Sequence, residues 1–270
     1  MSRTRSMFFG FAALALLSAL SAHARDAGSF DGYGYQSYAS GTPQCAFDYL
    51  DASGGSVLGL TAASGSAPAS DDGAAVLSLA APFELYGIST SALVVSSNGY
   101  LAAAADLASE DGGDFSADCP LPTIADNTAA SQSRIYVYHA DLDGAPNSGL
   151  IQARYFADCP RPADTGVAGA CTVVQWQNWA LRGQSGAIDM QTILYHASYE
   201  IVLQYLALDA SLGSTATFGT QGPDAISGHA AGCGGSRPLA QSTAICLFDP
   251  RFPPAASVVD AIFADGFDTP

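Results

Sequence analysis

The chain has 270 residues, of which 49% are apolar and 13% are charged, so it can form a full apolar core and is not disordered throughout. Its 25 acidic and 9 basic residues give a formal charge of −16, which repels phosphate backbones and anionic lipid and argues against nucleic-acid binding. All the basic residues are arginine, so a P-loop lysine or a Schiff-base lysine is excluded.

The first 24 residues carry the pattern of a secretory signal peptide. Arg3 and Arg5 precede an apolar run over residues 7–20. The small residues Ala22 and Ala24 then stand third and first before the expected cleavage site, as a signal peptidase requires. The run is shorter than the ~20 apolar residues that span a bilayer, which disfavours a membrane anchor. We therefore expect cleavage near Ala24 and a mature chain without a transmembrane segment that is secreted, periplasmic or held at the cell surface.

The mature chain divides into an irregular lead-in, a strand-rich region and a tail. Residues 25–70 are rich in Gly, Ser and Tyr and lack a clear period, so we expect an irregular N-terminal lead-in there. Residues 71–250 carry short β-branched or aromatic runs between turn signals, which predicts an all-β, antiparallel β-sandwich, and residues 251–270 form the C-terminal tail. The expected strands are 75–79, 83–86, 92–95, 100–103, 134–140, 150–156, 172–179, 190–195, 200–206 and 215–220.

One turn and one strand of this region can be assigned in more detail. Asn98-Gly99 permits the positive φ angles of a two-residue turn and predicts a hairpin between the flanking strands. In the strand 134–140, alternation puts Ile135, Val137 and His139 on one face, with two tyrosines opposite. Both faces are half apolar, so this strand is expected to be internal.

The strand 172–179 has a clearer inward face. Alternation puts Val174, Trp176 and Asn178 on one side and two glutamines on the other, so we expect the first side to line the core. Apart from the signal, the helical candidate is the Ala-rich stretch 100–110, which polar residues interrupt before a Gly-Gly pair. It is a weak candidate.

The cysteines predict three disulfides, because an exported chain can oxidise an even number of thiols. Spacing alone leaves 15 connectivities open. The pair Cys159–Cys171 brackets a Pro/Gly-rich loop, Cys233–Cys246 brackets a second such segment, and Cys45–Cys119 would remain. A zinc site is disfavoured because the chain has no C-x2-C pair.

A series of motifs follows in order from residue 71 to 222. It includes VSSNGYL at 95–101, WQN at 176–178 and IVLQY at 201–205. The series resembles the nidogen-like β-sandwich modules of bacterial secreted proteins, so the sandwich is expected to be jelly-roll or nidogen-like. The resemblance implies an extracellular binding or surface module without recognised catalytic residues, and it implies a fold rather than a ligand.

Acidic residues on loops make calcium the metal to consider, because Ca²⁺ prefers hard oxygen ligands. Asp141 and Asp143 would point the same way on a continuing strand and are the candidate ligands of one ion. Solvated turn acids are the simpler alternative at each cluster, so the expected cofactor is none or calcium. The three acidic clusters are Asp71/Asp72, Glu110/Asp111/Asp114/Asp118 and Asp141/Asp143.

Catalytic residues are not indicated. The mature chain has three histidines, His139, His196 and His229, and none lies in a motif for nucleophilic catalysis. A glycosidase needs two facing carboxylates, whereas the chain has only three glutamates and its aspartates lie in turn-like loops. We therefore name no catalytic residue and expect no enzymatic activity.

The expected function is a non-catalytic extracellular or cell-surface module for binding or adhesion, with an unknown protein or glycan as partner. A carbohydrate-binding accessory domain is the alternative, and an undetected secreted hydrolase is the third. Aromatic side chains are the usual sugar-binding surface, although core packing is the simpler role for them. The candidate aromatics are Tyr33, Tyr35, Tyr38, Trp179 and Tyr199.

The C-terminal stretch 262–268 looks like a short ending found on secreted proteins of some Gram-negative bacteria. It is either a sorting signal or a last strand that docks its apolar residues, and we favour the second interpretation.

Overall fold

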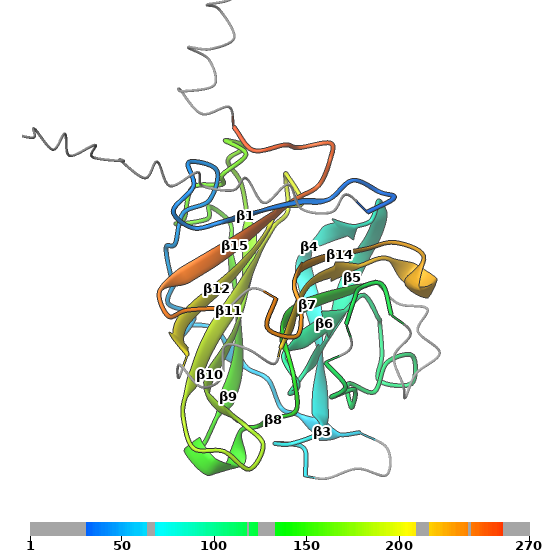
Figure 1. Cartoon of the computed structure of the whole chain (residues 1–270), viewed down its shortest axis with the longest axis vertical. Helices are drawn as coiled ribbons and strands as arrows, with labels where there is room; N and C mark the ends of the chain where they lie inside the picture. The colour runs from blue at the N-terminus through cyan, green and yellow to red at the C-terminus, as the bar shows by residue number, and fades with distance from the viewer. Residues whose placement is uncertain are drawn as a thin grey trace, which may run out of the picture.

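A computed structural model describes residues 31–63, 68–117, 119–123, 133–208, 216–236 and 239–255, and these residues form two antiparallel sheets (Figure 1). The larger sheet runs β1 (Gln36–Ala39), β15 (Thr243–Phe248), β12 (Ile201–Leu208), β11 (Ile188–Tyr195), β10 (Cys171–Leu181), β9 (Leu150–Phe156) and β2 (Ser56–Val57), with β8 (Leu142–Asp143) paired to β10. The smaller sheet runs β14 (Gly228–Gly232), β13 (Thr217–Gln221), β7 (Arg134–His139), β6 (Tyr100–Ala102), β5 (Ile88–Ser96), β4 (Gly73–Leu85) and β3 (Thr61–Ala62).

The expected all-β class is confirmed. The described residues contain two 3₁₀ turns, η1 (Ala145–Asn147) and η2 (Pro223–Ala225), and no α-helix, so the helical alternative at 100–110 is not formed and the expected strand 100–103 is confirmed. The stretch 100–110 forms β6 followed by turns. A membrane-spanning helix is likewise absent from the part of the chain that the structure describes. The expected signal peptide 1–24 and the stretch 262–268 lie outside that part.

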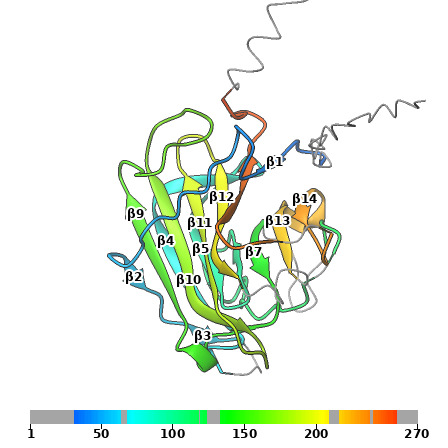
Figure 2. The ribbon, with the colours of Figure 1, turned by 60° about the vertical axis from the view of Figure 1, so that its left-hand side comes forward.

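The main apolar core lies between the two sheets, which face each other in Figure 1 and are seen one behind the other in Figure 2. Trp176 on β10 is fully buried there, as expected, and its indole N–H donates to the carbonyl oxygen of Ser96 on β5 over 3.0 Å. This bond satisfies the one polar atom of the largest core side chain. Other core residues are Leu93, Val95, Leu101, Ile135, Met190, Leu203, Tyr205 and Leu247.

A second apolar cluster covers the outer face of the larger sheet. The segment 45–52 lies over it and is held by two fully buried glutamines that pair across β11 and β12. Gln204 accepts from the N–H of Asp48 and donates to its carbonyl oxygen, both over 2.7 Å. Gln191 makes the same pair of bonds with Leu50, at 3.3 and 3.2 Å. Each glutamine side chain thus makes the two backbone hydrogen bonds that a neighbouring strand would otherwise make with the segment.

The expected irregular lead-in is therefore only partly correct. Its described residues include β1, β2 and β3, which pair with β15, β9 and β4 and so extend both sheets. Strands of two to four residues are too short to show a period in the sequence, and their partners are far away along the chain.

A β-bulge in β7 changes the expected faces of that strand. The N–H groups of Val137 and Tyr138 both donate to Gly99, at 2.9 and 3.0 Å, and both side chains enter the main core. The pairing with β13 shifts register over the same two residues. His139 therefore lies on the outer face beside Tyr136, and the expectation that it shares a face with Ile135 is wrong.

A second bulge changes β10. The pairing with β11 shifts between Trp176 and Trp179, so Trp179 enters the core and is 1% exposed. Asn178 is exposed, with φ 57°, and its N–H donates to a carboxylate oxygen of Asp189. The expected core position of Asn178 is therefore wrong, because strict alternation fails where one extra residue is inserted.

The predicted Asn98-Gly99 turn joins β5 and β6 and depends on glycine. Gly99 has φ 75°, and a Cβ there would lie 2.1 Å from the carbonyl oxygen of Tyr138. Gly99→Ala is thus expected to destabilise the protein by roughly 3 kcal/mol or more in urea unfolding, from backbone strain plus the clash.

The matched control for this change is Gly183→Ala. Gly183 has φ 70° but no atom within 4 Å of a built Cβ, so it carries only the strain, about 1–2 kcal/mol. Equal losses at the two positions would show that the close approach of Tyr138 is unimportant.

All six cysteines form disulfides. The expected pair Cys159–Cys171 is confirmed. The other expected pairs are wrong, because the structure has Cys45–Cys246 and Cys119–Cys233. Cys45 is carried onto β15 by the segment 45–52, and Cys233 follows β14, so tertiary pairing rather than proximity along the chain selects the partners.

Candidate functional site

Three aspartates from two of the predicted acidic clusters converge at the start of β4. We call Asp71, Asp72 and Asp141 the Asp71 cluster, since one carboxylate oxygen from each lies within 4.8 Å of the others. Asp71 and Asp72 are both 5% exposed. Arg182 pairs with Asp71 over 2.9 Å and approaches Asp141 to 4.0 Å. Burial raises the pKa of Asp71 and of Asp141, Arg182 opposes the shift, and neighbouring carboxylates add to it.

Asp143, the other expected calcium ligand, is placed differently. Its carboxylate accepts from the N–H of Ala145 over 2.8 Å, in the turn that begins η1. It does not belong to the group of converging oxygens, although its charge still acts on Asp71. The chain turns after β7, so the continuing strand that would have aligned Asp141 with Asp143 is not formed.

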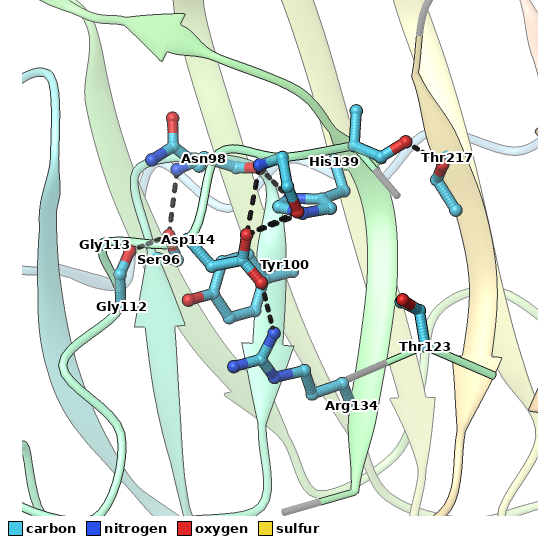
Figure 3. A network of polar contacts seen from close by, with 12 residues as sticks. Ser96, Asn98, Tyr100, Gly112, Gly113, Asp114, Thr123, Arg134, His139 and Thr217 are labelled. Carbon is cyan, nitrogen blue, oxygen red and sulfur yellow. Dashed lines mark hydrogen bonds and ion pairs between the residues drawn. The ribbon is translucent and has the colours of Figure 1, made fainter. Parts of the chain in front are cut away.

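A second set of charges is fully enclosed beneath the loop 103–123. We call Glu110, Asp114, Arg134 and His139 the Arg134 cluster, and Figure 3 labels Asp114, Arg134 and His139. Arg134 on β7 is 0% exposed and its two terminal nitrogens lie 2.5 Å from Glu110 and 2.6 Å from Asp114. His139 Nε2 lies 3.6 Å from Asp114, and the Tyr100 hydroxyl donates to Glu110 over 3.0 Å.

The Arg134 cluster keeps Asp114 ionised. Burial alone would raise the pKa of Asp114, but the contact with His139 and the charge of Arg134 outweigh it and hold that pKa well below its ordinary value. A carboxylate of this kind does not act as a general acid near neutral pH. Of the remaining acids in this predicted calcium cluster, Asp111 accepts from Gly113 in a turn and Asp118 lies outside the described residues.

A third set of charges lies under the Cys159–Cys171 loop. We call Arg161, Asp164 and Glu200 the Arg161 cluster; Arg161 bonds Asp164 and lies 3.7 Å from Glu200. A pocket of about 130 Å³ beside it is smaller than the roughly 300 Å³ that drug-sized ligands need. A sulfur of Cys246 is nearby, but it is bonded to Cys45 and is no thiolate ligand. The cluster is therefore a buried ion pair with one extra carboxyl.

That extra carboxyl makes stability depend on pH. Burial raises the pKa of Glu200 from 4.5 to about 9, and Asp164 adds to the shift while Arg161 opposes it. Between pH 4.5 and about pH 9, Glu200 holds a proton in the folded state and releases it in the unfolded state, so the free energy of unfolding falls as the pH rises. Glu200→Gln is expected to remove this part of the fall, which urea unfolding from pH 5 to 9 measures.

Glu84→Gln is the matched control, because Glu84 is half-buried and pairs with Arg251 near the surface. It should leave the pH dependence close to that of the wild type. If Glu200→Gln and the wild type lose stability in parallel, Glu200 is ionised in the folded protein and our assignment fails.

The predicted histidines bond to separate neighbours. His139 contacts the carbonyl oxygen of Asn98 at 3.1 Å, and His229 contacts the hydroxyl of Ser37 at 2.9 Å. His196 lies between the hydroxyl of Thr172 and the carbonyl oxygen of Pro82, and burial lowers its pKa. Among these described contacts, no histidine is paired with another.

The predicted sugar-binding aromatics do not form one platform. Tyr35 is 0% exposed and Trp179 is 1% exposed, so these two candidates are wrong. Tyr33 stacks on Tyr35 at 5.5 Å, Tyr38 packs edge-on against Phe248, and Tyr199 lies under the guanidinium of Arg251. The three half-buried tyrosines therefore also serve packing contacts.

Two residues that hold these sites were not expected from the sequence. Asn98, assigned only to a turn, bridges Asp72 and Leu142, and Arg182 is the counter-ion of Asp71. For Arg182 the scarcity of basic residues was the available signal, since each arginine in so acidic a chain is expected to lie near a carboxylate.

Comparison with known proteins gives one family. The sequence model described as NIDO related matches residues 37–244, which begin in β1 and end in β15 and so span both sheets. Searches of the curated proteins and of the solved structures find no match. The family match confirms the nidogen-like resemblance of the motif series.

Proposed function

Because the chain belongs to the NIDO-related family, we propose that it is a non-catalytic extracellular or cell-surface module that binds a protein or glycan partner. The family match over both sheets is the observation that carries this proposal. The pairing of all six cysteines supports an oxidising compartment, as expected for a chain exported by the segment 1–24.

The state of the buried charges favours binding over catalysis. In the Arg134 cluster both buried carboxylates bind the arginine, and in the Arg161 cluster Asp164 binds the arginine while Glu200 holds its proton. The charges of each cluster are therefore compensated within the protein, which suits a structural role. The pocket beside the Arg161 cluster is small for a substrate. The partner is therefore expected to bind on the surface, and the charge of −16 favours a neutral or basic one.

An array of extracellular-matrix proteins, envelope proteins and glycans, probed with the purified oxidised chain, tests the proposal. We expect selective binding that is lost when the same protein is reduced and alkylated, because the disulfides hold the loops of both sheets. Absence of binding to every protein and glycan, or turnover of ester, peptide or glycoside substrates, would count against a non-catalytic binding module. Six free thiols in the natural protein would rule out the proposed compartment.

A further inference from the structure

The Asp71 cluster is built on a rigid buried frame. Asn98 is 0% exposed, and its side chain donates to Asp72 over 3.0 Å and accepts from the N–H of Leu142 over 2.9 Å. The Ser97 hydroxyl donates to the carbonyl oxygen of Asp71 and accepts from the N–H of Gly73. Three loops are thus tied together, and the carboxylates are held in place by bonds within the protein.

The spacing of the carboxylates suits one cation. Calcium binds oxygen at 2.3–2.6 Å, so two oxygens on opposite sides of the ion lie roughly 4.6–5.2 Å apart. The three oxygens of the Asp71 cluster lie within 4.8 Å of one another. A single ion therefore reaches all three with little movement of the chain.

Unused oxygen atoms provide a second, independent observation. Asp71 is 95% buried, being 5% exposed, yet its Oδ1 accepts no hydrogen bond from the described residues. Oδ1 of Asp141 also accepts no hydrogen bond from them, and Arg182 approaches it only to 4.0 Å. A buried carboxylate oxygen without a donor costs free energy, and native proteins normally supply a partner.

The local charge points to a cation as that partner. Among the described residues, Arg182 is the basic side chain paired with the cluster, so one positive charge faces three carboxylates. Asp143 adds a further negative charge nearby. The Arg182 side chain is 47% exposed and can turn towards solvent without breaking a packed core.

We propose that Asp71, Asp72 and Asp141 bind Ca²⁺, and that Arg182 occupies the place of the ion when the site is free. The ligand set consists of carboxylates, without histidine or cysteine, which selects a hard cation over zinc or copper. With three carboxylates and a competing arginine, the dissociation constant is expected at about 10⁻⁴–10⁻³ M, as in extracellular calcium modules. The site is independent of the identity of the protein or glycan partner.

Calcium titration of the purified, chelator-treated protein tests the site. At 1 mM calcium we expect the melting temperature to rise by roughly 1–6 °C, with a matching heat in calorimetry. A protein whose melting temperature and calorimetric heat do not respond to calcium overturns the proposal. A larger response to the same concentration of Mg²⁺ overturns the choice of ion.

Variants locate the ion. Asp71→Asn and Asp141→Asn should each abolish the calcium response, and Asp141 is the safer change for folding because its side chain is 39% exposed. Asp143→Asn and the exposed Asp51→Asn are controls that should keep most of it. The reverse pattern, with loss at Asp143 and retention at Asp71 and Asp141, would overturn the ligand set.

Arg182→Gln separates the site from an ordinary ion-pair cluster. Removal of the competing guanidinium should tighten calcium binding by about tenfold or more, while the calcium-free protein becomes less stable. Weaker calcium binding in this variant would show that Arg182 does not occupy the place of the ion.

Discussion

Replacing Arg134 by methionine is expected to destabilise the protein by about 3–5 kcal/mol, because Glu110 and Asp114 would remain buried without their counter-ion. Arg134 is 0% exposed, so water cannot take over its role without opening the loop 103–123. Equilibrium unfolding in urea at pH 7 measures the loss. At low pH the difference from the wild type should shrink, since protonation removes the uncompensated charges.

Two further variants identify the cause of that loss. Arg154→Met is the matched control: Arg154 is half-buried and packs on the ring of Phe156, so its replacement should cost less than about 1 kcal/mol. Adding Glu110→Gln and Asp114→Asn to Arg134→Met should recover part of the stability. If the triple variant is no more stable than Arg134→Met, the loss comes from packing rather than from charge.

Removing the Cys45–Cys246 disulfide by double alanine substitution is expected to cost about 5 kcal/mol, against about 3 kcal/mol for Cys159–Cys171. The first bridge joins residues 201 positions apart and the second joins residues 12 apart, so the first restricts the unfolded chain far more. It also fastens the segment 45–52 over the outer face of the larger sheet. Guanidinium unfolding of both double variants measures the two losses.

The Cys159–Cys171 variant is the control for the first, since both pairs border the same outer apolar cluster. Equal losses would mean that local packing, and not the length of the closed loop, sets the contribution of each bridge. A larger loss in the Cys45–Cys246 variant than in the Cys159–Cys171 variant, together with protease sensitivity in the segment 45–52, would agree with our expectation.

The strands of the sandwich were largely predictable, whereas their faces were not. All ten expected strands lie in or overlap β4 to β7 and β9 to β13, and the two segments 75–79 and 83–86 prove to be parts of β4. Strand propensity and turn chemistry are properties of neighbouring residues. The position of a bulge depends on the pairing with the partner strand. The alternation of apolar residues in the sequence therefore could not show that the Tyr138 side chain enters the core and that the His139 side chain lies on the outer face.

The sequence identified the acidic residues of the Asp71 cluster, but it did not show that they belong to one site. Asp71, Asp72 and Asp141 were all recognised as loop acids, but in two separate clusters. Their meeting depends on the Asn98-Gly99 turn, which brings Asn98 between β4 and the end of β7. Only the folded chain could show that Arg182, more than a hundred residues from Asp71, is the charge that faces them.

The amino-acid order alone determined the class of fold and the NIDO-related likeness and favoured the local Cys159–Cys171 bridge, because hydrophobic alternation, turn residues and short loops act over a few positions. The tertiary structure decided which distant cysteines join, which acids share one site and which arginines neutralise buried carboxylates. Those outcomes depend on strand register and on loops laid across the sheets, and both are fixed by contacts between residues that lie far apart in the chain.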